Sequence, residues 1–169
     1  MKKILVFDLD GTLLDSLPDI RWALNTTLGE FGFPGHDLDR VRIMVGHGLT
    51  ELVRQAVPEG NKGDDQVKPL VKRIKDLYAS VPFRDTKPYP GLPELIAELK
   101  ACGHILGVLT NKADHIAKLI IPHFFPGMFD AIQGEKPELP RKPDPEAMMI
   151  ILRTLAPLAG LDPADQASM

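Results

Sequence analysis

Short apolar runs alternate with helical stripes at the two ends of the chain, whereas its middle carries helical stripes alone. The run Ile4–Phe7 is apolar on both faces, which is typical of a strand buried in a parallel sheet. Two further strands are predicted at His104–Leu109 and Phe129–Gln133. Because helical segments separate the later strands, the pattern predicts an α/β fold built on a parallel sheet.

The helices of this α/β part follow from apolar residues spaced three and four apart. After the last of them the sequence becomes polar and is expected to form a loop-like end. The expected helices are Leu92–Leu99, closed by Gly103; one through Ile116 and Ile120 that stops at Pro122; and one that contains Met148–Leu155, with Asp144 as its N-cap and Pro145 in its first turn.

From residue 17 to residue 82 no strand-like run interrupts the helical pattern. This middle segment is expected to be an all-helical insertion, and residues 83–90, which are rich in turn formers, a linker. The division places the α/β core at residues 1–16 and 83–169 and the insertion at residues 17–82. The helices expected in the insertion begin with Pro18 and the stripe Ile20–Phe31, and continue with Asp37–Val45, Leu49–Val57 and Val67–Tyr78.

Composition narrows the class of protein. The chain has 169 residues, enough for a domain with an insertion, and its net charge of −3 comes without a basic run, so nucleic acid is not an expected partner. No apolar stretch approaches the roughly 20 residues of a membrane span, so no membrane association is expected. The N-terminus leads directly into a strand, so no removable signal peptide is expected. Cys102 is the single cysteine, which fits a reducing cytoplasm.

Two carboxylates follow the first strand directly. Asp8 and Asp10 lie two residues apart at its carboxyl end, where open α/β sheets hold their ligands, and Gly11 lets the backbone turn there. Carboxylates this close repel each other unless a cation lies between them or one is protonated, and their oxygens suit Mg²⁺. The alternatives are a solvated turn or half of a calcium loop. Residues 12–14 (TLL) fill the positions where a calcium loop needs further oxygen ligands.

Two more candidate residues lie at the end of a strand and at the start of a helix. Thr110 follows the second predicted strand, so its hydroxyl and the adjacent amides can donate to phosphate oxygens. Lys142 precedes a helix N-terminus, where both the lysine and the helix dipole favour an anion. Taken singly, a threonine at a strand end is most often a packing residue and a loop lysine a solvated charge.

Together the three stretches resemble the motifs of the haloacid dehalogenase superfamily of phosphatases, and they occur in the same order. The resemblance covers the whole chain and implies a Rossmann-like core with the helical insertion as a cap. It also implies hydrolysis of a phosphate monoester through an aspartyl phosphate. The implied roles are Asp8 as nucleophile, Asp10 as general acid and base, Lys142 as a catalytic cation, Asp8 and Asp10 as ligands of Mg²⁺, and Gly11, Thr110, Asn111 and Lys142 as phosphate-binding residues.

Substrate choice is expected to depend on the insertion. Arg42, four residues before the turn Gly46-His47-Gly48, resembles the cap loop of phosphoglycolate phosphatases, where it would hold a small carboxylate. This resemblance implies a small phosphorylated metabolite as substrate, 2-phosphoglycolate or a similar compound. A helix-breaking turn beside a surface arginine is the alternative for this segment, and pyrophosphate or a sugar phosphate is an alternative substrate.

The fourth motif of the superfamily, a strand that ends in acidic residues, has no counterpart before Met169. Asp162 and Asp165 lie in a polar segment without a preceding apolar strand. We therefore expect a sheet truncated at its C-terminal side, weak binding of Mg²⁺, and an exposed edge on the first strand. Either copies of the chain associate through this edge, or the chain is markedly less stable than one that carries the missing segment. The alternative function is a catalytically impaired domain of this superfamily that binds phosphate or associates with itself.

Overall fold

The computed structural model of this protein describes residues 2–81 and 83–161. Within them the chain forms two compact units. The α/β unit contains the residues up to Leu14 and those from Pro88 onward, and the helical unit contains Asp15–Lys87. The sequence-based boundaries at residues 17 and 82 fall inside the helical unit, which extends beyond them at both ends.

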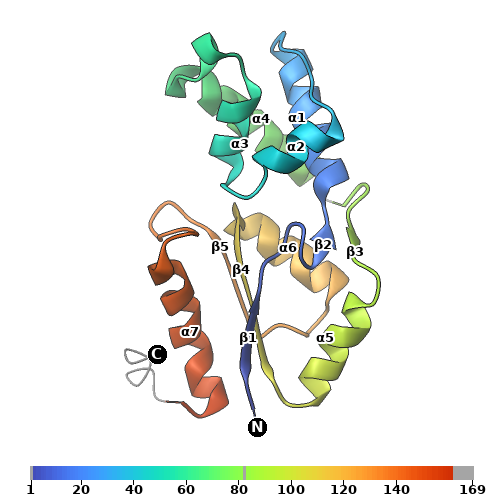
Figure 1. The fold of residues 1–169 in the computed structure, drawn as a ribbon, viewed down its shortest axis with the longest axis vertical. Coiled ribbons are helices and arrows are strands. Elements are labelled where there is room, and N and C mark those ends of the chain that lie inside the picture. Colours follow the sequence, from blue (N-terminus) through green and yellow to red (C-terminus); the bar gives the residue numbers. More distant parts are fainter. Residues whose placement is uncertain (1, 82, 162–169) are drawn as a thin grey trace. The chain divides into compact units, whose positions relative to one another are not determined.

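Three parallel strands form the sheet of the α/β unit, in the order β1-β4-β5 (Figure 1). They are β1 (Ile4–Phe7), β4 (Ile105–Ala113) and β5 (Ala131–Glu135). Phe7 pairs with Val108, so the carboxyl ends of β1 and β4 meet at one edge of the sheet. The prediction of an α/β fold with a parallel sheet is confirmed.

Helices cover both faces of this sheet. In Figure 1, α7 (Pro145–Ala159) lies on one side, and α5 (Leu92–Ala101) and α6 (Asp114–Phe124) lie on the other. The helix α7 approaches β4 closely, because a Cβ added to Gly107 of that strand would lie only 2.7 Å from Leu155 Cδ1. The core between α7 and the sheet consists of Ile105, Leu109, Ala147, Ile151 and Leu155.

The strand β4 is longer than the hydrophobic pattern predicts. The expected strand ends at Leu109, whereas β4 continues through Thr110 to Ala113 and pairs again with Glu135 of β5. The pairing register shifts between Leu109 and Ala113. A strand that becomes polar gives no hydrophobic signal, because main-chain pairing does not require apolar side chains. The predicted end at Leu109 is therefore wrong.

Two helices extend further than the sequence suggests. The helix α6 continues past Pro122 to Phe124, and the neighbouring Ile121 is buried. The helix α7 continues to Ala159 with Pro157 in its last turn, so the loop-like end begins later than expected. A proline near a helix end removes one hydrogen bond, and burial of the adjacent apolar side chains outweighs that loss.

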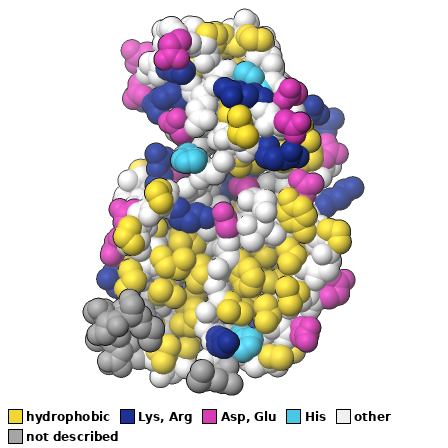
Figure 2. All heavy atoms as spheres, in the orientation of Figure 1, with side chains coloured by type: hydrophobic (Ala, Val, Ile, Leu, Met, Phe, Trp, Pro, Cys, Tyr) yellow, Lys and Arg dark blue, Asp and Glu magenta, His cyan; other side chains and the backbone are white. Residues whose placement is uncertain are grey.

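The strand β1 is an edge strand, since no strand among the described residues pairs with its outer side. Its four residues are only partly buried. Figure 2 shows hydrophobic side chains gathered on the visible face of the α/β unit. An exposed edge at this strand agrees with the expectation from the sequence. Asp162 and Asp165 lie outside the described residues.

The helical unit is built from α-helices, in agreement with the sequence pattern. Its elements are α1 (Leu17–Glu30), α2 (Leu38–Met44), α3 (Leu49–Ala56), the short 3-10 helix η1 (Glu59–Asn61) and α4 (Asp64–Ser80). The helix α1 packs against α2 and α4, and α3 packs against α2 and α4. No helix in the described part of the chain is long and apolar enough to cross a membrane.

A buried carboxylate joins the two ends of the helical unit. Asp19 in the first turn of α1 accepts hydrogen bonds from Asp85 N (2.8 Å), Thr86 N (3.0 Å) and Thr86 Oγ1 (2.6 Å). These bonds explain why residues 83–87 belong to the helical unit instead of forming a separate linker. The chain enters and leaves this unit through β2 (Leu14–Asp15) and β3 (Lys87–Pro88), which form a two-stranded sheet.

Candidate active site

The loop after β1 is closed by its own main chain. Leu9 O accepts a hydrogen bond from Leu14 N (3.1 Å), and Gly11 N donates to Leu14 O (2.9 Å). Gly11 has a φ angle of +77°, which a residue without a Cβ adopts at low cost. Both leucines are fully buried. The loop is thus anchored in the core and holds Asp8 and Asp10 at the end of β1.

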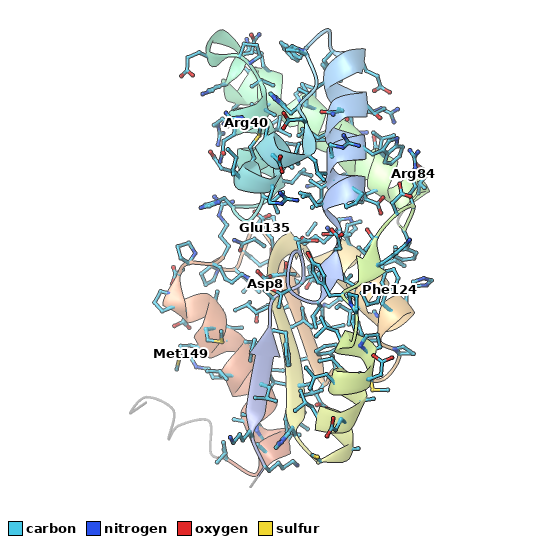
Figure 3. The ribbon with its side chains drawn as sticks, turned by 45° about the vertical axis from the view of Figure 1, so that its right-hand side comes forward. Asp8, Arg40, Arg84, Phe124, Glu135 and Met149 are labelled. Carbon is cyan, nitrogen blue, oxygen red and sulfur yellow. The ribbon has the colours of Figure 1, made fainter. Side chains whose placement is uncertain are left out.

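Asp8 is the more exposed of the two carboxylates. Figure 3 labels it at the end of β1. Its side chain is 43% exposed. Its Oδ1 accepts a hydrogen bond from Leu9 N (2.7 Å) and lies 2.8 Å from Lys142 Nζ. One oxygen of the carboxylate is therefore held by two donors, while the side chain remains accessible to a ligand.

Lys142 is positioned by the segment that starts α7. Asn111 Nδ2 donates to the carbonyl oxygen of Lys142 (3.0 Å) and ties this segment to the end of β4. Asp144 caps α7 by accepting from Glu146 N (2.9 Å), and Pro145 occupies its first turn. The predicted start of this helix is confirmed, and it places the lysine beside the helix N-terminus.

Asp10 is more enclosed than Asp8 and pairs with a different lysine. Lys112 Nζ lies 2.9 Å from Asp10 Oδ1, and the two side chains are only 9% and 16% exposed. Lys112 belongs to the extended end of β4, and its N–H donates to Thr110 Oγ1 (3.2 Å). Thr110 and Asn111 are both buried. The end of β4 thus brings a hydroxyl, an amide and an ammonium group alongside the carboxylates of the loop.

A further group of charges supports the ends of β4 and β5. Asp114 Oδ1 accepts from Gly134 N (3.1 Å), and Asp114 Oδ2 lies 2.9 Å from Lys118 Nζ and 3.6 Å from Lys136 Nζ. Burial raises the pKa of Asp114, but the hydrogen bonds from Lys118 and Gly134 and the charges of both lysines outweigh burial and leave the pKa lowered. A Cβ on Gly134 would lie 2.4 Å from Asp114 Cα, so this close approach requires glycine.

Two carboxylates and two ammonium groups therefore meet at the strand ends. The set contains an accessible carboxylate that can attack an electrophile, an enclosed carboxylate that can transfer a proton, and donors for an anion. In residues 2–81 and 83–161, no group of three or more His, Cys, Asp or Glu side chains could hold a metal ion. Asp8 and Asp10 nevertheless fit Mg²⁺, which proteins bind through one or two carboxylates together with water and substrate phosphate.

The residues expected to select the substrate belong to the helical unit. Arg42 is 60% exposed and pairs with Asp39 of the same helix, with Nη1 and Oδ1 2.6 Å apart. Gly46 and Gly48 have φ angles of +120° and +84°, and Gly48 is the N-cap of α3. His47 between them is exposed. An exposed arginine before a glycine turn is common to both sequence-based interpretations of this segment.

Lys112, Asp114 and Gly134 are functional candidates that the sequence-based set does not contain. Lys112 and Gly134 lie where β4 and β5 run beyond the apolar residues that predict them, and Asp114 is the first residue of α6. One signal was available: Thr110 and Lys112 are two residues apart and therefore share a face of any strand that continues past Leu109.

Known proteins resemble this chain over most of its length. The family model described as haloacid dehalogenase-like hydrolase matches residues 5–163. A phosphoglycolate phosphatase of Rhodospirillum rubrum is 36% identical over 178 residues, which cover 100% of this chain and 71% of that protein. Phosphoglycolate phosphatase 1 of Pseudomonas aeruginosa is 29% identical over 170 residues, which cover 98% of this chain and 61% of that protein. This chain thus spans less than two thirds of the length of some relatives.

Solved structures agree with this relationship. The crystal structure of a predicted phosphoglycolate phosphatase from Haemophilus somnus has a TM-score of 0.81 and 28% identity, and the match covers 95% of this chain and 72% of that chain. A haloacid dehalogenase-like family hydrolase from Streptococcus pneumoniae has a TM-score of 0.79 and 28% identity, covering 92% and 72%. Because the family model spans most of the sequence and the fold agrees, the chain belongs to the haloacid dehalogenase-like hydrolase family.

Proposed function

We propose that this chain carries the reaction centre of a Mg²⁺-dependent phosphatase that hydrolyses 2-phosphoglycolate or a similar small phosphate monoester. The observation that carries the proposal is the separate pairing of Asp8 with Lys142 and of Asp10 with Lys112. The accessible carboxylate suits a nucleophile and the enclosed one suits proton transfer. The names of relatives in Rhodospirillum rubrum and Pseudomonas aeruginosa support the class of substrate.

In the first half of the reaction, an oxygen of Asp8 attacks phosphorus and the bond from phosphorus to the ester oxygen breaks. Asp10 enters this step protonated and gives its proton to the departing oxygen, which leaves as an alcohol. Asp8 then carries the phosphoryl group as an aspartyl phosphate.

In the second half, a water molecule attacks the phosphorus of the aspartyl phosphate. Asp10, now ionised, takes a proton from that water, and the bond from phosphorus to the Asp8 oxygen breaks. Inorganic phosphate leaves, and both carboxyl groups return to their initial states. One acidic side chain thus serves both halves, as donor and then as acceptor.

The cations and donors of the site bind the phosphoryl oxygens. Lys142 Nζ, 2.8 Å from the proposed nucleophile, is close enough to neutralise a phosphoryl oxygen that reaches Asp8. The Thr110 hydroxyl accepts from Lys112 N and keeps its own proton to donate. Asn111 holds Lys142 through its side-chain amide, and Gly11 lets the loop bring its backbone toward the anion.

Charge balance supports the use of Mg²⁺. With Asp10 protonated, two ammonium groups and the Asp8 carboxylate leave one positive charge, which does not balance a phosphate dianion. When bound, Mg²⁺ supplies the missing positive charge beside the phosphoryl oxygens and lowers the repulsion between nucleophile and substrate. Asp8 would hold it through its carboxylate and Asp10 through its carbonyl oxygen.

Turnover of 2-phosphoglycolate and p-nitrophenyl phosphate, with Mg²⁺ or with EDTA, tests the proposal. We expect Asp8→Asn to lower kcat by at least about 1,000-fold, because it removes the nucleophile. Asp39→Asn, a matched change in the exposed Arg42 pair, should leave kcat within about twofold. Acid-quenched protein should carry a phosphoryl adduct that Asp8→Asn lacks. Substantial turnover by Asp8→Asn contradicts the mechanism. A wild-type chain without turnover would favour the impaired, phosphate-binding domain.

Association of two copies through β1 is a separate proposal. The outer side of β1 has no strand partner among the described residues, so its main-chain groups can pair with those of a second copy. Sedimentation velocity at increasing protein concentration should show a dimer. A monomer at every concentration would contradict this proposal.

A further inference from the structure

Lys112 has no role in the proposed mechanism, although its ion pair is the least exposed of the charged contacts at the strand ends. Its ammonium group lies 2.9 Å from Asp10 Oδ1. The neighbouring Lys142–Asp8 pair has a similar distance, 2.8 Å, but is considerably more accessible. A lysine enclosed with a carboxylate in this way is costly unless the pair is maintained.

The main chain around Lys112 is held on both sides. Its N–H donates to Thr110 Oγ1 (3.2 Å), and its carbonyl oxygen lies 2.7 Å from where a Cβ of Gly134 would be. Asp114, two residues later, binds Gly134 N. The backbone of β5 thus fits closely against this end of β4, so the base of the lysine side chain has little freedom to shift.

We infer that Lys112 is a positioning residue for Asp10: by holding Oδ1, it sets the rotation of the carboxyl group and aims the other oxygen at the reacting atoms. The inference rests on the proposed function for the use of Asp10 in proton transfer. Lys112 can remain bound in both halves of the reaction. When Asp10 carries a proton on Oδ2, Oδ1 is a carbonyl oxygen and still accepts from the ammonium group.

This role predicts a dependence on the leaving group. An alcohol such as glycolate needs a proton to leave, whereas p-nitrophenolate is stable as an anion and leaves without one. Misaligning Asp10 should therefore lower kcat/KM, which covers the steps up to departure of the leaving group, for 2-phosphoglycolate and leave kcat/KM for p-nitrophenyl phosphate nearly unaffected. Hydrolysis of the aspartyl phosphate also uses Asp10, but it comes later, is common to both substrates and affects kcat alone. A residue that only maintains the fold, or that binds the phosphoryl group common to both substrates, would affect both equally.

Kinetics of Lys112→Met test the positioning role. We expect kcat/KM for 2-phosphoglycolate to fall by about 30-fold or more, and kcat/KM for p-nitrophenyl phosphate by less than about threefold. Lys112→Arg should recover part of the loss, and Lys112→Met should add little to Asp10→Asn. Lys118→Met, which removes a lysine that pairs with Asp114, is the matched control and should not lower kcat/KM for one substrate more than for the other. Equal losses in kcat/KM on both substrates would overturn the positioning role.

Thermal melting tests the pairing without requiring activity. Lys112→Met and Asp10→Asn should each lower Tm by about 4–8 °C, because each leaves an enclosed charge without this partner. The double variant should lose clearly less than the sum, whereas Lys118→Met and Asp10→Asn should add. Additive losses for Lys112 and Asp10 would overturn the inference. If the wild-type chain hydrolyses neither substrate, the proposed function fails, and the melting cycle still decides whether Lys112 holds Asp10.

Discussion

Ion pairs that involve aspartate differ between the strand ends of the α/β unit and the helix α2 of the helical unit. In the α/β unit, Lys112 and Lys142 reach carboxylates more than one hundred residues away in the sequence, at enclosed or partly enclosed positions. In the helical unit, Arg42 pairs with Asp39 one turn earlier in the same helix, and both side chains are largely exposed. Exposed pairs of this kind contribute roughly 0–1 kcal/mol to stability.

The difference teaches that burial and sequence separation, more than residue type, distinguish a reaction centre from a solvated surface. A pair between distant segments fixes the strand ends relative to each other, so the fold itself holds its charges in place. A pair within one helix turn adds only local support. The experiments below change one unit at a time and should therefore have unequal effects.

Glycine substitutions should give the largest contrast in stability. Gly134→Ala places a Cβ 2.4 Å from Asp114 Cα and should lower the free energy of unfolding by more than about 3 kcal/mol. Gly29→Ala in α1 meets nothing within 4 Å and should raise it by about 0.5–1 kcal/mol, because alanine favours a helix. Urea unfolding measures both. A neutral Gly134→Ala would show that the ends of β4 and β5 are not held as the structure indicates.

The buried carboxylate of the helical unit should rank next. Asp19→Ala removes the acceptor of three hydrogen bonds and leaves buried donors without it, which should cost about 2–4 kcal/mol in the free energy of unfolding. Thr86→Val removes a single donor and should cost about 1 kcal/mol. Equal losses from the two variants would mean that the main-chain bonds from Asp85 and Thr86 contribute little.

Acid should weaken the α/β unit through carboxylates with lowered pKa. Burial raises the pKa of Asp114 and of Asp130, but hydrogen bonds and lysine charges outweigh it and bring both below the ordinary value of 3.8. Their contribution is present above that ordinary value and is lost as pH falls through the lower, folded-state pKa. Asp114→Asn should therefore flatten the fall in Tm at the acid end of a pH series.

Ionic strength distinguishes the contribution of Asp114 to stability from that of exposed ion pairs. In the helical unit, a hydrogen bond from Arg73 lowers the pKa of Glu30, which is an exposed group. Raising the ionic strength should weaken the Glu30–Arg73 contact more than the Asp114 contacts, because exposed charges are screened more strongly. If high salt abolished the acid-dependent fall in Tm that is due to Asp114, the enclosed position of that carboxylate would not protect its contacts from screening.

The smallest effect on stability, and the most selective effect on activity, is expected at the exposed arginine of α2. Arg42→Ala should change the free energy of unfolding by less than about 0.5 kcal/mol, since its ion pair with Asp39 lies on the surface. If the resemblance to a carboxylate-binding loop holds, kcat/KM should fall more for 2-phosphoglycolate than for p-nitrophenyl phosphate. Arg40→Ala in the same helix, labelled in Figure 3, is the matched control. Equal losses for both substrates would indicate a structural role.

Much of the architecture was predictable because its signals are local. Apolar runs mark β1 and most of β4, helical spacing marks α1 and α4, and Asp144 marks the start of α7. The positions of Asp8, Asp10, Thr110 and Lys142 were predictable for a related reason: each lies just after or just before an element whose pattern is clear. Because parallel strands have their carboxyl ends at the same edge of a sheet, the residues that follow them are expected to lie close together.

Only the tertiary structure decided which cation meets which carboxylate. The chain has 20 lysines and arginines, and no spacing indicates that Lys112 reaches Asp10 while Lys142 reaches Asp8. That assignment depends on the polar extension of β4 past Leu109, on its register shift against β5, and on the close approach that Gly134 permits. The sequence by itself thus determined the elements and the residues at their ends. Long-range packing decided the partners, because a contact between distant segments depends on the path of every segment between them.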